Sequence, residues 1–252
     1  MTETGRLLAS GRDSDIFEHA PGLVLRRARN ARSMETEARV MQYVHAHGFP
    51  VPEVDRVLEG GTELVMERVD GPTMLDDAAA HPWRIGRHAR LLAELHARLH
   101  EIPAPEWLDQ LSDGGDRVVH LDLHPLNVLM SRRGPVVIDW TNAHRGDGLT
   151  DVALTWILLS TARAPGGPLR QVLVRAFRAL FLRSFLSRFD KAALSARVPV
   201  VARTKTEDPN MSRLEAEAML RLADHHEKRS VPRPPSVHGS RPATDYPCGE
   251  RP

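Results

Sequence analysis

Short alternating runs of apolar residues near the start of the chain predict β-strands. The run Leu23–Arg26 follows a Pro-Gly turn, and the run Leu64–Glu67 follows a Gly-Gly turn. Between the two runs, apolar residues recur at helical spacing from Ser33, the expected N-cap, to Gly48, which predicts one helix. The order strand, helix, strand indicates a small lobe that mixes both kinds of element.

Helical patterns dominate the chain after Pro82. A leucine stripe over residues 91–99 predicts one helix, which Pro103 ends. Two short strands are expected at Val118–Leu121 and Val136–Ile138, with a polar turn between them. The remaining elements are expected to be helices, at Val152–Leu159, at Leu169–Phe189 and after a capping box at Ser212–Glu215.

These patterns divide the chain into three expected parts. Residues 1–70 form a β-rich N-terminal lobe, residues 71–229 form a larger and mainly helical lobe, and a linker near Gly71 joins them. Residues 230–252 are rich in Pro, Ser and Arg and lack apolar periodicity, so we expect a disordered tail. The fold class that the pattern predicts is α+β.

Composition and charge exclude several classes of protein. The 34 Lys and Arg residues nearly balance the 33 Asp and Glu residues, whereas nucleic-acid-binding domains usually carry a clear basic excess. Cys248 is the only cysteine of the chain, which excludes an internal disulfide framework and a Cys-based zinc site. The N-terminal residues lack the pattern of a signal peptide, and the longest apolar run, Val152–Leu159, is far shorter than the roughly 20 residues that span a bilayer. We therefore expect a cytoplasmic protein without a nucleic-acid or membrane partner.

The polar residues of one central segment carry the candidate chemistry. Asp122 and Asn127 lie on a loop between the two short strands, and Asp139 follows the apolar strand after that loop. Two carboxylates and an amide oxygen at strand ends offer the hard oxygen ligands that Mg²⁺ prefers. An acid at the end of an apolar strand is costly unless it is paired or binds a metal. The segment therefore predicts a magnesium site.

The same segment has the spacing of the kinase pattern H-x-D-x-x-x-x-N followed by a metal-binding Asp. With Leu-His after Asp122 and Trp140 after Asp139, the chain resembles the aminoglycoside phosphotransferase-like family of small-molecule kinases. The resemblance implies a bilobal protein-kinase-like fold. It also implies Mg²⁺-dependent transfer of the γ-phosphoryl group of ATP, or of GTP, to a hydroxyl group of a small molecule. A protein kinase is disfavoured, because only about a dozen residues separate Asp139 from Asp151 and leave little room for an activation segment.

The resemblance also implies roles for the residues of the motif. Asp122 would act as the catalytic base toward the acceptor hydroxyl, and Asn127 and Asp139 would hold the metal ions that bridge the nucleotide phosphates. His120 would brace the loop or would be a satisfied core histidine. His124 would assist near the transferred phosphate or would make a structural hydrogen bond.

A cation and an acid in the first lobe fit the same scheme. Arg26 stands on the strand where the family usually has a Lys that approaches the phosphates. Glu37 shares the apolar stripe of the following helix, and an inward carboxylate requires a partner, for which Arg26 is the natural choice. The alternative is that Glu37 lies at the partly exposed edge of the stripe.

Three further assignments each have a plain structural alternative. Ser10 and Gly11 begin a polar loop that would cover the phosphates or would form an ordinary turn. Backbone groups near Glu67 and Val69 would bind the adenine or would belong to an ordinary strand end. Asp151 would hydrogen-bond the catalytic loop, as in the family, or would be the N-cap of the helix that it opens.

One other class of function competes with a kinase, and one pattern that resembles a metal site does not support a metalloprotease. A non-catalytic kinase-like nucleotide-binding module is favoured by Arg26 in place of Lys and by a loop with a single glycine, but the intact set of three motif residues opposes it. His96 and His100 have the i, i+4 spacing of metal ligands, yet they lack the glutamate of the metalloprotease motif. We expect these two histidines to cap or flank the leucine stripe.

The overall charge balance hides a basic segment. Ten Lys and Arg residues stand against a single acid, Asp190, between Arg163 and Lys205. A pocket for polycationic aminoglycosides should be acidic, to offset the charge of the substrate. We therefore expect a neutral or anionic acceptor, and the alternative interpretation of the segment is a solvated arginine face on amphipathic helices.

Overall fold

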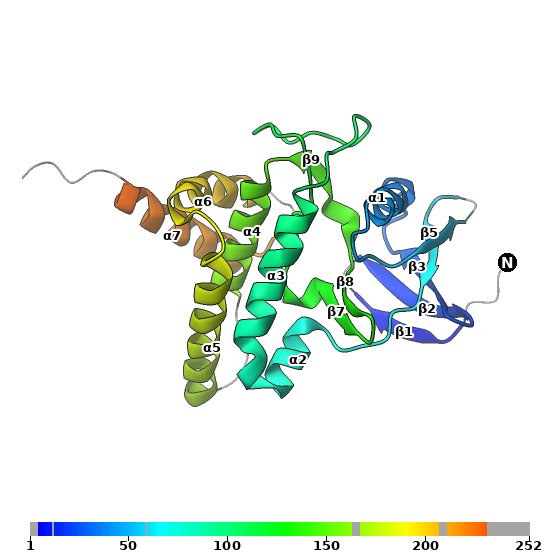
Figure 1. Ribbon diagram of the computed structural model, residues 1–252, viewed down its shortest axis with the longest axis horizontal. Coiled ribbons are helices and arrows are strands. Elements are labelled where there is room, and N and C mark those ends of the chain that lie inside the picture. Colours follow the sequence, from blue (N-terminus) through cyan, green and yellow to red (C-terminus); the bar gives the residue numbers. More distant parts are fainter. Residues whose placement is uncertain (1–4, 12, 59, 163–166, 207–210, 231–252) are drawn as a thin grey trace, which may run out of the picture.

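The computed structural model has two lobes, one built around a β-sheet and one built mainly of helices (Figure 1). It describes residues 5–11, 13–58, 60–162, 167–206 and 211–230. This mixed architecture confirms the predicted α+β fold class. The predicted tail lies outside the described residues except for Ser230, which is the last residue of the final helix.

The N-terminal lobe contains a five-stranded antiparallel sheet in the order β1-β2-β3-β5-β4. The central strand β3 buries Val24, Leu25 and Arg26 in succession, so side chains on both faces of the sheet are shielded from solvent at this point. The sequence predicts β3 and β5 from their apolar runs, whereas the edge strands β1 and β4 are largely exposed and carry no such signal. The strands are β1 (Leu7–Ser10), β2 (Ser14–Ala20), β3 (Leu23–Ala28), β4 (Val54–Val57) and β5 (Glu63–Glu67).

The helix α1 (Glu35–Ala46) lies beside this sheet (Figure 1). It buries Glu37 together with the apolar residues of its stripe, so Glu37 is directed inward and not toward the solvent. The helix begins later than the sequence predicts. Met34, and not Ser33, occupies the N-cap position, and the Ser33 hydroxyl accepts a hydrogen bond from the Glu35 amide at 3.2 Å.

The linker between the lobes runs close against the second lobe. Gly71 has a φ of +154°, and a Cβ atom at this position would lie 2.4 Å from the carbonyl oxygen of Met130. The Met130 amide in turn donates to the carbonyl of Pro72 at 2.8 Å. Only glycine permits this approach, which fixes the linker onto the hairpin that follows residues 120–127, the candidate catalytic loop.

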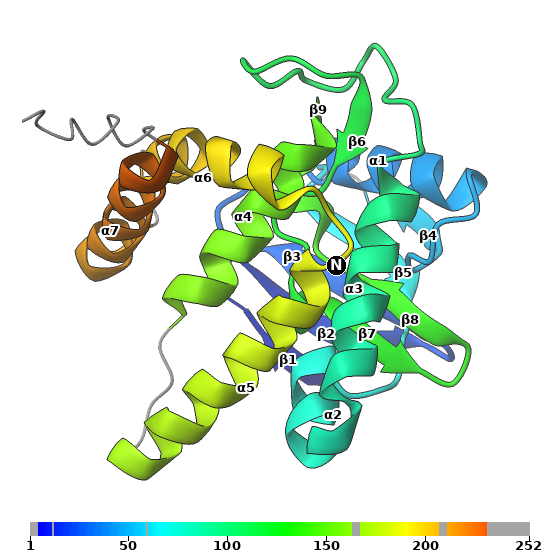
Figure 2. The ribbon, with the colours of Figure 1, turned by 60° about the vertical axis from the view of Figure 1, so that its left-hand side comes forward.

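The helix α3 (Ile85–Leu99) is at the centre of the second lobe, with α5 beside it in both Figure 1 and Figure 2. The predicted helix Leu169–Phe189 is too long by three residues, because the chain turns after Leu186 and Asp190 caps a separate helix, α6. The capping box of α7 is present, since Ser212 and Glu215 exchange hydrogen bonds. The other helices are α2 (Met74–Ala80), α4 (Gly148–Thr161), α5 (Pro168–Leu186), α6 (Lys191–Lys205) and α7 (Arg213–Ser230).

Two small strand pairs carry the segments around the motif. The predicted strand Val118–Leu121 ends early, at Val119, which frees the next residues to form the catalytic loop. The polar turn expected after residue 130 joins β7 and β8 into one hairpin. The pairs are β6 (Arg117–Val119) with β9 (His144–Gly146) and β7 (Val128–Ser131) with β8 (Gly134–Val137).

One hydrophobic cluster extends through both lobes. At the junction of the lobes, Phe49 packs edge-on against Trp140, with 5.7 Å between the ring centroids. Both side chains are almost fully buried, so the junction is a packed interior and not a hinge through water. None of the helices in the described residues has both the length and the apolar character that crossing a membrane requires.

Candidate active site

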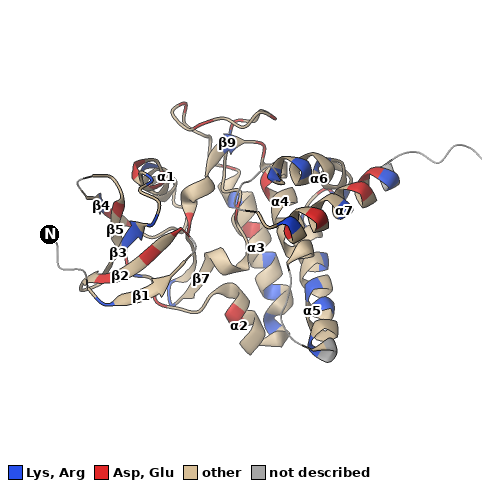
Figure 3. Cartoon of the chain, turned by 180° about the vertical axis from the view of Figure 1, so that it is seen from behind, with Lys and Arg blue, Asp and Glu red and all other residues tan. Residues whose placement is uncertain are grey.

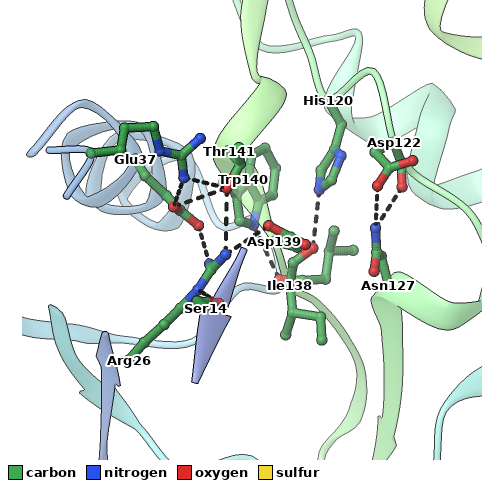
Figure 4. A network of polar contacts seen from close by, with 12 residues as sticks. Ser14, Arg26, Glu37, His120, Asp122, Asn127, Ile138, Asp139, Trp140 and Thr141 are labelled. Carbon is green, nitrogen blue, oxygen red and sulfur yellow. Dashed lines mark hydrogen bonds and ion pairs between the residues drawn. The ribbon is translucent and has the colours of Figure 1, made fainter. Parts of the chain in front are cut away.

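The catalytic loop between β6 and β7 folds back on itself through Asp122 and Asn127 (Figure 4). The Asn127 side-chain amide donates to the Asp122 carbonyl at 2.9 Å and to Asp122 Oδ2 at 3.0 Å. His124 Nε2 lies 3.3 Å from Asp122 Oδ1. The Asp122 carboxylate is thus held from both sides, yet 29% of its side chain is exposed, so a ligand can reach it.

The loop is also tied to the end of β8. The His120 ring donates from Nε2 to the carbonyl of Ile138 at 3.2 Å, and the Ile138 amide donates to the Asn127 carbonyl at 3.0 Å. The His120 ring is fully buried and packs against Trp140, with 4.7 Å between the ring centroids. His120 is therefore both a core histidine and a brace between the catalytic loop and the strand that leads to Asp139.

Two residues of the site hold a left-handed backbone conformation. Leu121 has a φ of 60°, and Asp139 has a φ of 65°. Residues other than glycine adopt this region at a cost, and such strain persists only where the surroundings enforce it. Its presence on both sides of the site indicates that the directions of the Asp122 and Asp139 side chains are imposed by the fold.

Asp151 supplies the enforcing contacts on the catalytic loop. Its carboxylate accepts hydrogen bonds from the amides of His120, at 3.1 Å, and of Leu121, at 2.8 Å. The interpretation of Asp151 as an N-cap is wrong, because the cap of α4 is Asp147, whose side chain accepts from the Leu149 amide at 2.9 Å.

His96 and His100 complete this arrangement from α3. The His100 ring donates from Nε2 to Asp151 Oδ2 at 3.0 Å, and His96 Nδ1 lies 3.6 Å from the same oxygen. His96 also donates from Nε2 to the carbonyl of Leu123 on the loop, at 3.2 Å. The sequence places these histidines at the flank of a leucine stripe, but it does not indicate that they face Asp151.

The pKa values of Asp151 and His96 are both shifted from their usual values. Burial alone would raise the pKa of Asp151, but the contacts with His100 and His96 hold that pKa well below its usual value. Burial lowers the pKa of His96, although the Asp151 carboxylate works in the opposite direction. Asp151 therefore remains an anion beneath the catalytic loop.

Arg26 joins the first lobe to the second (Figure 4). Its Nη1 pairs with Glu37 Oε1, its Nη2 donates to Asp139 Oδ1 at 2.8 Å, and its Nε donates to the Ser14 hydroxyl at 2.9 Å. The predicted pairing of Arg26 with Glu37 is present, and Glu37 is not a stripe-edge residue, because only 3% of its side chain is exposed.

The charge of Arg26 controls the state of Asp139. Burial alone would raise the pKa of Asp139, but the nearby Arg26 charge and its hydrogen bond lower that pKa below the usual value. Asp139 is consequently a carboxylate at neutral pH, and its side chain is 43% exposed. An ionised and accessible carboxylate is what a metal ligand requires.

Three contributors to this network carry no clear signal in the sequence. Thr141 Oγ1 donates to Glu37 Oε2 at 3.2 Å and accepts from Arg32 Nη2 at 2.9 Å. Ser14 accepts from Arg26, as described above. Thr141 lies two residues after Asp139, but its residue type does not indicate this contact, and Arg32 and Ser14 reach the site only through the tertiary fold.

The loop that begins at Ser10 forms a turn closed by polar contacts. The Ser10 hydroxyl donates to Asp15 Oδ1 at 2.6 Å, and Arg29 Nη2 pairs with the same oxygen at 2.7 Å. The Gly11 amide donates to the carbonyl of Ser14 at 2.9 Å. The loop leads directly into Ser14, the partner of Arg26, so it lies next to the proposed phosphate region.

At the strand end that is expected to bind adenine, some polar groups already have partners within the protein. The Glu67 amide donates to the carbonyl of Glu53 at 2.8 Å, and the Glu67 carboxylate pairs with Arg133 Nη2 at 2.6 Å. The Glu67 amide is therefore not available to a nucleotide. The role of Val69, two residues further along the linker, stays a prediction.

The oxygen donors of the site fit a magnesium ion. Asp139 offers an ionised carboxylate. Asn127 directs its amide nitrogen toward Asp122, which turns its oxygen away from that carboxylate (Figure 4). Mg²⁺ is usually bound by one or two such protein oxygens, with water and phosphate completing the octahedron.

A comparison with models of protein families shows to which family the chain belongs. A model described as the phosphotransferase enzyme family (APH) matches residues 4–114 and 104–194. The chain belongs to this phosphotransferase family. The match covers the strand of Arg26, the catalytic loop and Asp139, and it confirms the predicted kinase-type phosphotransferase. A search of curated proteins gives no match to this phosphotransferase.

Solved structures share the fold of the phosphotransferase. Aminoglycoside phosphotransferase APH(4)-Ia superposes with a TM-score of 0.63 at 16% identity, over 90% of this chain and 94% of that chain. A thermostable mutant of APH(4)-Ia in a ternary complex with AMP-PNP and hygromycin B gives a TM-score of 0.60 at 16% identity, over 89% and 93%. A choline/ethanolamine kinase family protein from Mesorhizobium loti gives 0.56 at 13% identity, over 89% of each chain. The predicted kinase-like bilobal fold is confirmed.

Proposed function

We propose that this phosphotransferase catalyses Mg²⁺-dependent transfer of the γ-phosphoryl group of ATP, or of GTP, to a hydroxyl group of a small molecule. The observation that carries the proposal is the continuous chain of contacts from Glu37 through Arg26 to Asp139, which lies close to Asp122 and Asn127 (Figure 4). It brings a cation, two metal-type ligands and a base together at the junction of the lobes. Relatives solved with AMP-PNP or ADP support a nucleotide as co-substrate.

In the proposed reaction, Asp122 is the group that acts on the acceptor. Its carboxylate orients the hydroxyl and accepts its proton as the oxygen bonds to phosphorus. The Asn127 amide and the contact with His124 fix the direction of this carboxylate before the acceptor arrives. Such pre-organisation lowers the entropic cost of orienting the carboxylate during the reaction.

Arg26 supplies the positive charge of the nucleotide site. Buried contacts with Glu37 and Ser14 fix its guanidinium, while its Nη2 faces the accessible Asp139. A fixed cation stabilises the charge of the β- and γ-phosphate oxygens as the bond to the leaving group breaks. Asn127 and Asp139 would hold Mg²⁺, which when bound neutralises phosphate charge. Ser10 and Gly11 would lie over the phosphates, and Val69 would contact the adenine.

Calorimetry of nucleotide binding tests the assignment of Asp139. We expect Asp139→Asn to lose most of its affinity for Mg²⁺-ATP, because the charged metal ligand is gone. In EDTA, where the metal cannot contribute, the variant and the wild type should bind ATP alike. Unchanged affinity for Mg²⁺-ATP in the variant would refute this role.

The alternative is a non-catalytic nucleotide-binding module. It is favoured by the ion pair between Arg26 and Asp139, because Asp139 is a proposed metal ligand and the arginine occupies one of its oxygens. Turnover separates the two functions. A kinase releases ADP in proportion to the amount of phosphorylated acceptor. A non-catalytic module binds Mg²⁺-ATP but phosphorylates none of the hydroxyl compounds offered to it.

A further inference from the structure

A pocket of about 750 Å³ lies in the helical lobe beside the catalytic loop. His124, Pro125 and Leu126 of the loop form one part of its wall, and residues from α2, α3, α4, α5 and α7 form most of the rest. Because His124 Nε2 is 3.3 Å from Asp122 Oδ1, the wall of the pocket lies one side chain away from the proposed base. The volume is within the range of about 300–1,000 Å³ that is usual for small-molecule sites.

The wall of this pocket is mainly apolar. Four large hydrophobic side chains that line it are about half exposed: Leu75 at 47%, Leu126 at 49%, Leu173 at 54% and Leu214 at 53%. They come from α2, the catalytic loop, α5 and α7, which are distant in sequence. Exposed apolar side chains that converge on one concave surface mark a site for an apolar ligand.

The charges around the pocket disfavour a cationic ligand. Arg170 and Arg178 line it, and α5, which carries both, has no acidic residue along its length (Figure 3). Arg178 is held in place by the carbonyls of Ser160 and Ala162, which are uncharged backbone groups.

The acidic residue of the wall, Glu215, is engaged in the capping box. Its carboxylate accepts from the Ser212 amide at 3.0 Å and from the Ser212 hydroxyl at 2.7 Å. A polycationic acceptor would therefore meet two arginines and one carboxylate that already has partners, which is the reverse of the acidic surface that it needs.

From these observations we infer that the acceptor is a hydroxyl-bearing molecule with a largely apolar skeleton and no cationic groups. The inference rests on the proposed function and names its substrate class. The apolar part of the acceptor packs on the four leucines, and its hydroxyl group reaches Asp122. The hydroxyl oxygen bonds to the γ-phosphorus, its proton passes to the Asp122 carboxylate, and the bond from the γ-phosphorus to the β,γ-bridging oxygen breaks to release ADP.

A matched pair of variants on α5 tests the pocket directly. Leu173 lines the pocket, whereas its neighbour Val172 is equally exposed, at 58%, but does not line it. The probe is 8-anilinonaphthalene-1-sulfonate, titrated by fluorescence into the full chain. Because a carboxylate at position 173 faces the bound apolar group, Leu173→Asp should weaken binding by at least about tenfold, and Val172→Asp by less than about twofold. Unchanged Mg²⁺-AMP-PNP binding verifies that each variant is folded.

A transfer assay then compares two classes of acceptor. With Mg²⁺-ATP, a hydroxylated steroid such as cholate or a hydroxylated macrolactone should be phosphorylated with a higher kcat/KM than hygromycin B or streptomycin. A preference for the two polycations, or equal effects of the two variants on probe binding, would overturn the inference and leave the proposed function in place. Absence of transfer to both classes, with Mg²⁺-AMP-PNP still bound, would instead contradict the proposed function and the acceptor with it.

Discussion

Arg26 makes contacts with all three nitrogens of one planar group, and this geometry explains why an arginine stands at this position. Its Nε, Nη1 and Nη2 point to Ser14, Glu37 and Asp139 respectively. A lysine ammonium carries the same charge, but it has no planar fork with which to reach three directions at once. Burial would lower the pKa of Arg26, but the charges of Glu37 and Asp139 raise it, so the guanidinium stays charged.

The substitution Arg26→Lys should therefore lower stability more than activity. We expect the free energy of unfolding to fall by about 1–3 kcal/mol, because buried acceptors lose their donors. The KM for ATP should change less, since the positive charge remains. Urea denaturation and steady-state kinetics measure the two quantities. The control is Arg27→Lys on the same strand, where the more exposed Arg27 pairs with Glu63. Equal losses of stability in the two variants would contradict the account.

At the scale of elements, the catalytic loop is positioned by the helix that follows it and by α3. Asp147 caps the start of α4, and Asp151 in the first turn of the helix binds two loop amides. Close packing makes the second contact possible. A Cβ atom on Gly148 would lie 2.6 Å from the ring of His100, the partner of Asp151. Asp147 therefore stabilises the start of the helix, and Asp151 holds the catalytic loop.

The two acids should give different kinetic results when they are changed. We expect Asp151→Asn to lower kcat by about 10- to 100-fold, as for supporting residues around other sites, with little change in the KM for ATP. Asp147→Ala should cost about 1 kcal/mol of stability through the lost cap and should retain kcat. Turnover and thermal unfolding distinguish the outcomes. If both variants only lose stability to a similar extent, Asp151 does not position the loop.

The lobes behave as one packed body in which buried ionisable groups matter. The hydrophobic cluster crosses the junction at Phe49 and Trp140, and the contact of Arg26 with Asp139 crosses it again. The cluster of His96, His100 and Asp151 lies within the helical lobe, with His96 and Asp151 fully buried. Protonation of such groups should therefore change the stability of the molecule as a whole.

The pH dependence of stability follows from the direction of each shift. The pKa of His96 is lowered in the folded chain, so the unfolded chain takes up a proton first and stability falls as the pH drops below about 6.5. The pKa values of Asp139 and Asp151 are also lowered, so their contribution is complete above about 3.8 and is lost as the pH falls through their folded values.

Denaturation by urea at several pH values measures this profile. We expect His96→Gln to flatten the decline between pH 7 and pH 5 and to leave the loss below pH 4 in place. The exposed His45 on α1 provides the control, since His45→Gln should keep the slope of the wild type. A slope between pH 7 and pH 5 that is the same in all three proteins would contradict the role of His96.

The sequence predicts the parts of this molecule whose signals are local. The central strands and the long helices show continuous or periodic apolar residues, and the loop from His120 to Asn127 has fixed spacing. The missed elements depend on distant partners. The short strand β9 pairs with β6 across the whole catalytic loop and the β7–β8 hairpin, and it has no apolar run that would predict it.

The site divides in the same way. Asp122, Asn127 and Asp139 follow from the motif, and the pairing of Arg26 with Glu37 follows from one inward acid. The place of His96 and His100 beneath Asp151 depends on how α3 packs on α4, which no local pattern specifies. The apolar pocket likewise arises from elements distant in sequence. The basic composition of α5, in contrast, follows from the sequence alone.

The most direct test of the account compares Asp122→Asn with the wild type in two measurements. Phosphoryl transfer from Mg²⁺-ATP is followed with the best acceptor of the transfer assay, and Mg²⁺-AMP-PNP affinity is measured by calorimetry. Because the base is lost while the nucleotide site is intact, kcat should fall by about 10²–10⁴-fold with affinity nearly unchanged. The exposed Asp116 serves as control, and Asp116→Asn should keep the kcat of the wild type. Transfer by Asp122→Asn at the rate of the wild type would contradict the central claim.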